Sequence, residues 1–246
     1  MKFYELSHIG GFHLNHNEDY SLIAEAGKSR MLIAVMDGCS SGSDSYFAST
    51  LIGKLLRKIA KEESYREYAT RETPALNSQL EKISLKLFDE LVLINRQLDL
   101  KSDELLSTII LGLIDTEEKS AELLIVGDGY IHVNGAGIEY DNDNKPDYIG
   151  YHLNEEKDLW YSSKTEKLSV EKIKDLTIST DGIHTFRNFD GKSYDPISES
   201  EIHRRFFEDL NDLENSNKLK KVFIDIESVN GLRPSDDLSM IRVINA

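Results

Sequence analysis

The feature that most constrains this chain is an apolar run that ends on Asp-Gly, and it occurs three times in 246 residues. Such a run predicts a buried strand that carries one carboxylate to the rim of a core. The glycine lets the backbone come close to whatever that carboxylate binds. The three runs with their ends are Leu32–Met36 with Asp37-Gly38, Leu123–Gly127 with Asp128-Gly129, and Leu176–Thr180 with Asp181-Gly182.

Each Asp-Gly pair is also a common hairpin turn, because both residues tolerate positive φ. Two further acidic pairs stand before apolar runs, Glu18-Asp19 near the start of the chain and Asp236-Asp237 near its end. Carboxylates that converge from different strand ends are what a pair of hard divalent cations needs. The recurrence therefore favours a metal site over a series of unrelated turns.

Composition narrows the function classes. The 44 acidic and 29 basic residues give a formal net charge of −15, which disfavours a nucleic-acid partner and a nuclease activity. The first residues lack an apolar leader region and no later run is long enough for a membrane span, so no membrane partner is expected. One cysteine fits a reducing compartment. We expect a cytoplasmic protein.

Periodicity predicts separate blocks of strands and helices, and hence an α+β fold with mostly antiparallel sheets in one domain, 1–246. The charged interval 61–71 predicts a solvated helix end and loop, and the polar interval 137–170 a loop and small flap. Strands are expected at about 3–8, 20–26, 31–36, 106–114, 121–126, 130–133, 173–180 and 238–244. Helices are expected from about 45 to 60 and at about 74–98, 182–187, 199–211 and 215–229.

Six short motifs follow one another along nearly the whole chain. They are Asn17-Glu18-Asp19, Val35-Met36-Asp37-Gly38, Ser107-Thr108, Val126-Gly127-Asp128-Gly129, Ser179-Thr180-Asp181-Gly182 and Ser235-Asp236-Asp237-Leu238-Ser239. No single motif is specific, but the ordered set resembles that of the metal-dependent serine/threonine protein phosphatases of type 2C. The resemblance is to the single-domain bacterial members.

This resemblance implies a four-layer sandwich of two mostly antiparallel β-sheets flanked by helix pairs, with the interval 137–170 as a flap near substrate. It also implies two Mn²⁺ or Mg²⁺ ions at one end of the sandwich and a weaker third. The implied metal ligands are Asp37 between the two ions, Asp181 and Asp236 on one, Glu18 and the Gly38 carbonyl on the other, Asp19 in support, and Asp128 with Asp181 on the third.

The chemistry implied by the resemblance is hydrolysis of phosphoserine and phosphothreonine in proteins by a metal-activated water. The implied partners are a phosphoprotein substrate and a cognate serine/threonine kinase. His184 follows Asp181 by three residues, so it is a candidate general acid, although a packing role at the rim is the favoured alternative. His13 and His16 are candidates for contact with substrate.

Several positions depart from the pattern of the resembled family, among them Ser40 and Ser41 in a loop that is usually richer in glycine. Leu14 stands where the family places an arginine that grips the substrate phosphate, which motivates a second hypothesis, a phosphatase-like regulatory module with weak turnover. Cys39 lies in a loop without arginine, beside acids that we expect to raise the pKa of its thiol, so a cysteine nucleophile is disfavoured.

Overall fold

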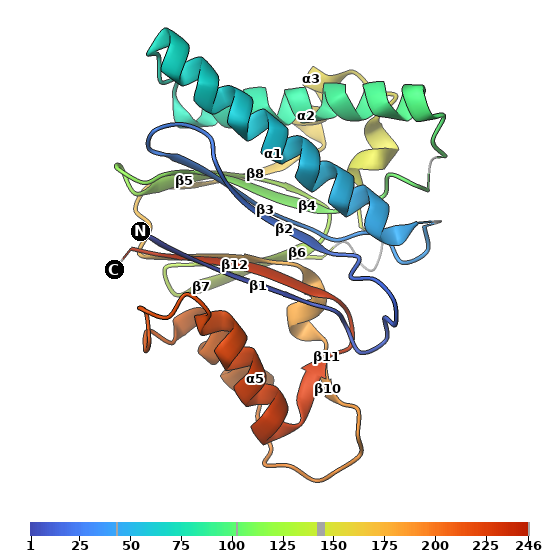
Figure 1. Cartoon of the computed structure of the whole chain (residues 1–246), viewed down its shortest axis with the longest axis vertical. Coiled ribbons are helices and arrows are strands. Elements are labelled where there is room, and N and C mark those ends of the chain that lie inside the picture. Colours follow the sequence, from blue (N-terminus) through green and yellow to red (C-terminus); the bar gives the residue numbers. More distant parts are fainter. Residues whose placement is uncertain (43, 102, 142–145, 246) are drawn as a thin grey trace.

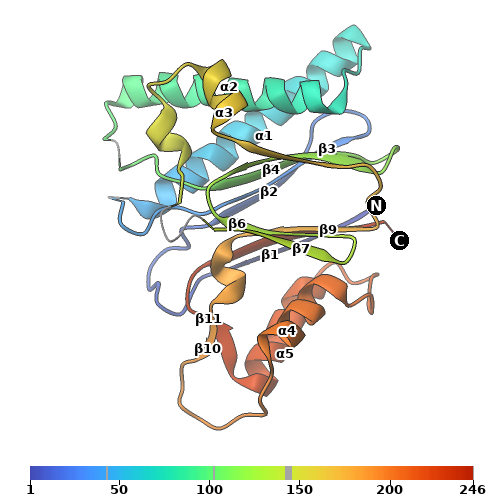
Figure 2. The same cartoon turned by 180° about the vertical axis from the view of Figure 1, so that it is seen from behind.

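Two five-stranded antiparallel sheets lie face to face, and helices cover the outer face of each (Figures 1 and 2). The computed structural model describes residues 1–42, 44–101, 103–141 and 146–245. Both termini lie at one end of the sandwich, and the loop that joins β1 to β2 lies at the other (Figure 1). The predicted α+β sandwich is confirmed.

The first sheet has the order β1-β12-β9-β6-β7 and the second the order β2-β3-β4-β5-β8. The first sheet comprises β1 (Lys2–His8), β12 (Leu238–Ile244), β9 (Asp175–Ser179), β6 (Gly129–Val133) and β7 (Ala136–Tyr140). The second comprises β2 (Tyr20–Glu25), β3 (Arg30–Met36), β4 (Ile109–Asp115), β5 (Ser120–Val126) and β8 (Glu166–Val170). A separate hairpin pairs β10 (Phe186–Asn188) with β11 (Leu232–Pro234).

Helices form the two outer layers. The second sheet is covered by α1 (Ser45–Thr70), α2 (Leu76–Leu98) and α3 (Lys157–Ser163), and the first by α4 (Glu199–His203) and α5 (Lys218–Asn230). Short 3₁₀ helices span Ile149–His152 and Asp181–His184, and a π-helical turn spans Arg204–Glu208. In the described part of the chain, no helix is apolar over a length that could cross a bilayer.

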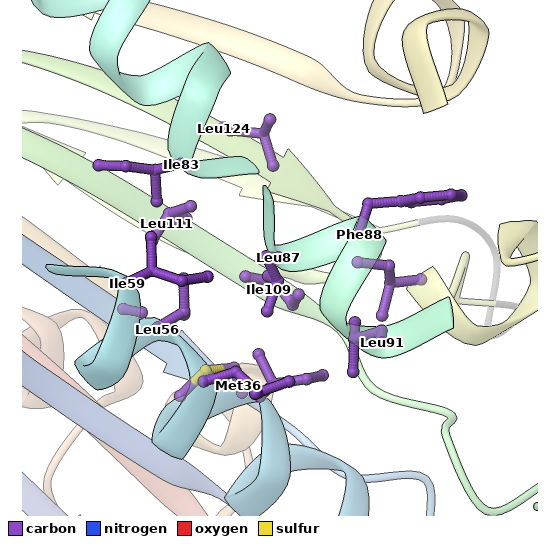
Figure 3. Close-up of a cluster of buried hydrophobic side chains, with 14 of the residues drawn as sticks. Met36, Leu56, Ile59, Ile83, Leu87, Phe88, Leu91, Ile109, Leu111 and Leu124 are labelled. Atoms are coloured by element: carbon purple, nitrogen blue, oxygen red, sulfur yellow. The ribbon is translucent and has the colours of Figure 1, made fainter. Parts of the chain in front are cut away.

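Three hydrophobic clusters hold these layers together. Ile33, Ile178 and Ile241 belong to the cluster between the sheets. In a second cluster Leu56 of α1 and Leu87 of α2 pack on the second sheet (Figure 3). The third cluster joins α4 and α5 to the first sheet. Each fully buried aliphatic side chain stabilises the fold by about 1.5–3 kcal/mol, so the clusters hold the strand ends in fixed positions.

The interval 61–71 is not a solvated loop, because α1 continues through Thr70. The side chain of Glu63 is buried there and forms ion pairs with Arg66 (2.8 Å) and Lys82 (2.9 Å). These cations offset the desolvation of the carboxylate. The charge run therefore contributes to the contact between α1 and α2.

The interval 137–170 contains more regular structure than the expected loop and flap. It supplies most of β7 and all of β8, the edge strands of the two sheets, and also carries α3. Most side chains of both strands are exposed or half-buried, so their sequences lack a clear apolar alternation. Residues 142–145 of this interval lie outside the described residues. The interval 182–187 is likewise only partly helical, since β10 begins at Phe186.

Candidate metal centre

The strand register brings the acidic strand ends together at one end of the sandwich. The first residue of β2 pairs with the last residue of β3, so Asp19 and Asp37 are neighbours. Ser179 at the end of β9 pairs with residues of both β6 and β12. The segment that follows it therefore carries Asp181 close to Asp128 and Asp236, whose charges both act on it.

Asp19, which is buried, and Asp37, which is half-buried, form the floor of this carboxylate cluster. Burial raises the pKa of both carboxyl groups well above the usual range, and repulsion between neighbouring carboxylates raises it further. Asp19 accepts a hydrogen bond of 2.7 Å from the Thr180 hydroxyl, which links the two sheets. The same hydroxyl accepts a hydrogen bond from the Ser239 amide. Thr180 is thus a positioning residue whose partners the linear sequence did not identify.

Asp181 and Asp236 form the more open rim of the cluster. Although Asp181 retains contact with solvent, the surrounding protein desolvates it and raises its pKa to about 6, with repulsion from Asp236 and Asp128 adding to the effect. Burial also raises the pKa of Asp236. A site that raises the pKa of four carboxyl groups together is electrostatically suited to cations.

Glu18 is held by two serine hydroxyls of the segment after β3. Its carboxylate accepts hydrogen bonds from Ser40 (2.7 Å) and Ser45 (2.5 Å). Its backbone carbonyl accepts from the Gly38 amide at 3.2 Å. A side chain at position 38 would collide with the Ser45 carbonyl, so this close approach requires glycine. Ser40 and Ser45 therefore position a candidate ligand.

Asp237 is a structural acid that joins the segment between β1 and β2 to the start of β12. Its side chain is 1 % exposed and accepts hydrogen bonds from the backbone amides of Gly10 (2.6 Å) and Glu18 (2.5 Å). His13 Nδ1 lies 2.9 Å from Asp237 Oδ2, and His13 Nε2 lies 3.7 Å from Asp236 Oδ1. Burial lowers the pKa of His13, but its hydrogen bond to the Asp237 carboxylate and the charges of the nearby carboxylates outweigh burial and raise the pKa.

The other candidate residues lie at different places around the cluster. His16 is exposed and packs on the Tyr46 ring, with 4.4 Å between ring centroids. Leu14 is 89 % exposed. His184 is close enough to Asp181 to lower its pKa, while its Nδ1 lies 3.3 Å from Glu199 Oε1. His13 is therefore integrated with the carboxylates, whereas His184 also belongs to a neighbouring group of side chains.

Cys39 lies in the same loop as Ser40, and the expected direction of its pKa shift is wrong. Burial raises the pKa of the thiol, but hydrogen bonds with Ser41, Tyr148 and backbone amides outweigh burial and lower it. The Sγ atom lies 3.1 Å from the Ser41 hydroxyl. The loop carries no arginine to bind a phosphate, so the composition argument against a cysteine nucleophile remains.

The donor set of the cluster fits hard divalent cations. Glu18, Asp19, Asp37, Asp181 and Asp236 all offer carboxylate oxygens, which Mg²⁺ and Mn²⁺ prefer. The surrounding protein desolvates Asp19 and Asp37, which penalises their charges unless a cation is present. The residues present therefore suit the pair of ions that the sequence motifs implied.

Comparison with known proteins identifies the family. The family model described as protein phosphatase 2C matches residues 13–226, which is most of the chain. The chain belongs to the protein phosphatase 2C family. Its class is that of a phosphoric monoester hydrolase, a protein serine/threonine phosphatase. The motif resemblance is thereby confirmed, and metal dependence is a property of this family.

Solved structures similar to this phosphatase share its fold at low sequence identity. A bacterial serine phosphatase variant is 16 % identical with a TM-score of 0.66, and the match covers 100 % of this chain and 99 % of that one. Stp1 from Staphylococcus aureus is 14 % identical with a TM-score of 0.62 and coverages of 99 % and 94 %. RsbX in complex with magnesium is 18 % identical with a TM-score of 0.51 and coverages of 98 % and 92 %. No curated protein matches the sequence.

Proposed function

We propose that this phosphatase removes phosphate from phosphoserine and phosphothreonine residues of proteins by a two-metal mechanism. The observation that carries the proposal is the convergence of Glu18, Asp19, Asp37, Asp181 and Asp236 at one end of the sandwich. These residues would hold two ions, which would supply a water of lowered pKa as the nucleophile and positive charge beside the phosphoryl oxygens. The magnesium of the RsbX complex supports the choice of a hard cation.

The surrounding residues keep the proposed ligands in place. Thr180 fixes the orientation of Asp19 across the two sheets, and Ser40 and Ser45 fix that of Glu18. Asp237 anchors the segment that carries Glu18, since its carboxylate accepts a hydrogen bond from the Glu18 backbone amide. A displacement of about 1 Å at such a site costs on the order of 10²-fold in rate. We therefore expect the loss of any of these supporting hydrogen bonds to lower the rate of hydrolysis.

Two arginines of the β10–β11 hairpin offer positive charge that position 14 does not. Arg187 lies over the Phe12 ring at 5.2 Å, and Arg233 over the Phe189 ring at 4.7 Å. The two arginines are cross-strand partners in the β10–β11 hairpin. The segment that carries Phe12 is joined to β11 by a hydrogen bond of 2.9 Å from the Gly11 amide to the Pro234 carbonyl. We propose that this pair guides the anionic substrate towards the metal centre.

A second candidate function is a phosphatase-like regulatory module with weak turnover. The exposed Leu14 favours it, because leucine cannot form the bidentate contact with phosphate that an arginine would form. For either function we expect phosphoproteins as partners, and a serine/threonine kinase that modifies the same substrates.

Hydrolysis of a phosphothreonine peptide with Mn²⁺, with Mg²⁺ and with EDTA tests the proposal. We expect turnover with either metal and none with EDTA, and we expect Leu14→Arg to change the rate by less than about tenfold. Negligible turnover by the wild-type protein that Leu14→Arg restores would replace the first function by the second. Turnover that persists in EDTA would contradict the metal mechanism.

A further inference from the structure

A second group of metal-binding side chains lies beside the carboxylate cluster and outside the ligand set described above. His184 ends the 3₁₀ helix that begins at Asp181, while Glu199 and His203 are four residues apart on α4. One nitrogen of each imidazole and one carboxylate oxygen lie within 4.8 Å of one another. Glu199 and His203 share a helix face because of their spacing, so both can face the same point.

Two of the distances between candidate ligand atoms approach those around a coordinated ion. His184 Nδ1 lies 3.3 Å and His203 Nε2 lies 3.9 Å from the same oxygen of Glu199. Tetrahedral Zn²⁺, with bonds of about 2.0–2.1 Å, separates its ligand atoms by about 3.3 Å. The first spacing already matches this value, and the second exceeds it by about 0.6 Å. An adjustment of the exposed Glu199 side chain can supply this difference.

The two histidines also contain buried polar atoms that need a partner. Among the described residues, neither Nε2 of His184 nor Nε2 of His203 has a hydrogen-bond partner, and both atoms are buried. Unpartnered buried nitrogens are costly, and a cation against His203 Nε2 would remove that cost. His184 Nε2 faces Glu139 Oε1 at 3.8 Å. A carboxylate behind the second nitrogen of a metal-bound imidazole is a common supporting arrangement.

Aromatic neighbours hold both imidazole rings in place. Tyr130 packs with its edge against His184 at 5.2 Å between centroids, and Phe207 packs in the same manner against His203 at 5.3 Å. The ring centroids of the two imidazoles are 5.0 Å apart. Burial lowers the pKa of His203, and the neighbouring His184 lowers it further. A neutral imidazole retains the lone pair that a metal ion requires.

We propose that His184, His203 and Glu199 form a second metal site that binds a late transition-metal ion of the zinc type. Imidazole donors favour Zn²⁺ and its neighbours over Mg²⁺, whereas the all-carboxylate cluster favours hard ions. The two sites therefore separate cations by their chemistry. Because the new site includes the end of the 3₁₀ helix that starts at Asp181, an ion there would tie α4 to the rim of the carboxylate cluster.

Binding of Co²⁺ and Zn²⁺ to the whole protein in the presence of excess Mg²⁺ tests the proposal. Co²⁺ reports imidazole coordination by its visible absorption, and Zn²⁺ is then measured by competition. We expect one Co²⁺ per chain under these conditions. We expect His203→Gln and Glu199→Gln each to weaken Zn²⁺ binding by at least about tenfold. Glu201→Gln, which removes the same charge from α4 at a residue paired with Arg204 and Arg205, is the matched control and should bind as wild type does.

The outcomes separate this site from the phosphatase proposal, because the measurement uses no activity. Zn²⁺ affinity that is unchanged in both His203→Gln and Glu199→Gln would overturn the site. Loss of the Co²⁺ signal on addition of Mg²⁺ would also overturn it, since the ion would then occupy the carboxylate cluster. Should His203→Gln not fold, Glu199→Gln decides the question, because that side chain is exposed and its loss does not open the core.

Discussion

The carboxylate cluster should destabilise the metal-free protein, and Asp181→Asn measures that cost. The pKa of Asp181 rises from 3.8 to about 6, chiefly because the surrounding protein desolvates the charged form. A shift of this size corresponds to about 3 kcal/mol. Because Asp181 is exposed at the rim, solvent screening reduces the cost to about 1.5 kcal/mol. Removing the charge should therefore stabilise the protein by about that amount in EDTA at pH 7.5.

The sign and pH range follow from linkage. An aspartate whose pKa is higher in the folded state than in the unfolded state destabilises the folded state when it is charged. Below pH 4 both states are protonated and the cost is absent. It grows between pH 4 and 6 and is complete above pH 6. The advantage of Asp181→Asn should therefore decline as pH falls from 7.5 to 4.5.

Urea unfolding in EDTA at pH 7.5 and 4.5 measures this effect. Wild type, Asp181→Asn and the control Asp225→Asn are compared, the last being an exposed aspartate on α5 whose change should alter stability by less than about 0.5 kcal/mol. Excess Mg²⁺ should stabilise the wild type more than Asp181→Asn, because the ion offsets the repulsion that the variant lacks. An Asp181→Asn protein that is no more stable than wild type at pH 7.5 would refute the reasoning.

Three further predictions concern other parts of the molecule. Arg242→Leu should lower the free energy of unfolding, measured by urea denaturation, by about 3–5 kcal/mol. The change leaves the Asp175 carboxylate and the Phe206 and Asp209 carbonyls without their buried hydrogen-bond donor. A loss below about 1 kcal/mol would contradict this. Asp128→Ala should reduce phosphatase activity while calorimetry still finds tight Mn²⁺ binding, and loss of all tight binding would remove it from the weaker third site. Arg233→Gln should raise KM for an acidic phosphopeptide about tenfold with little change in kcat, whereas an unchanged KM would exclude Arg233 from substrate binding.

The fold was predictable where strands are buried on at least one face. Strands such as β4 and β12 are buried throughout, so their apolar runs are continuous. Edge strands β7 and β8 were not predicted, because most of their side chains contact solvent and pairing with a neighbouring strand determines their structure. The charged end of α1 was missed for a related reason. Glu63 is stabilised by Lys82 of another helix, a contact that local sequence does not reveal.

The convergence of the acidic strand ends was predictable from the sequence, whereas the residues that support them were not. Asp-Gly after an apolar run marks the end of a strand, and the register of antiparallel strands then brings Asp37, Asp128 and Asp181 to one end. Thr180 was missed because its partner Asp19 is 161 residues away in sequence. The His184, Glu199 and His203 group was missed because the packing of α4 on the first sheet creates it.

Titration of Mn²⁺ into metal-free wild type and Asp37→Asn, with hydrolysis of a phosphothreonine peptide measured on the same samples, tests the central claim most directly. If the cluster is the metal centre of a phosphatase, the wild type binds at least two Mn²⁺ and hydrolyses the peptide. Asp37→Asn then stays folded but neither binds two Mn²⁺ nor hydrolyses the peptide. Wild-type rates of Mn²⁺-dependent hydrolysis by Asp37→Asn would contradict the assignment of the cluster.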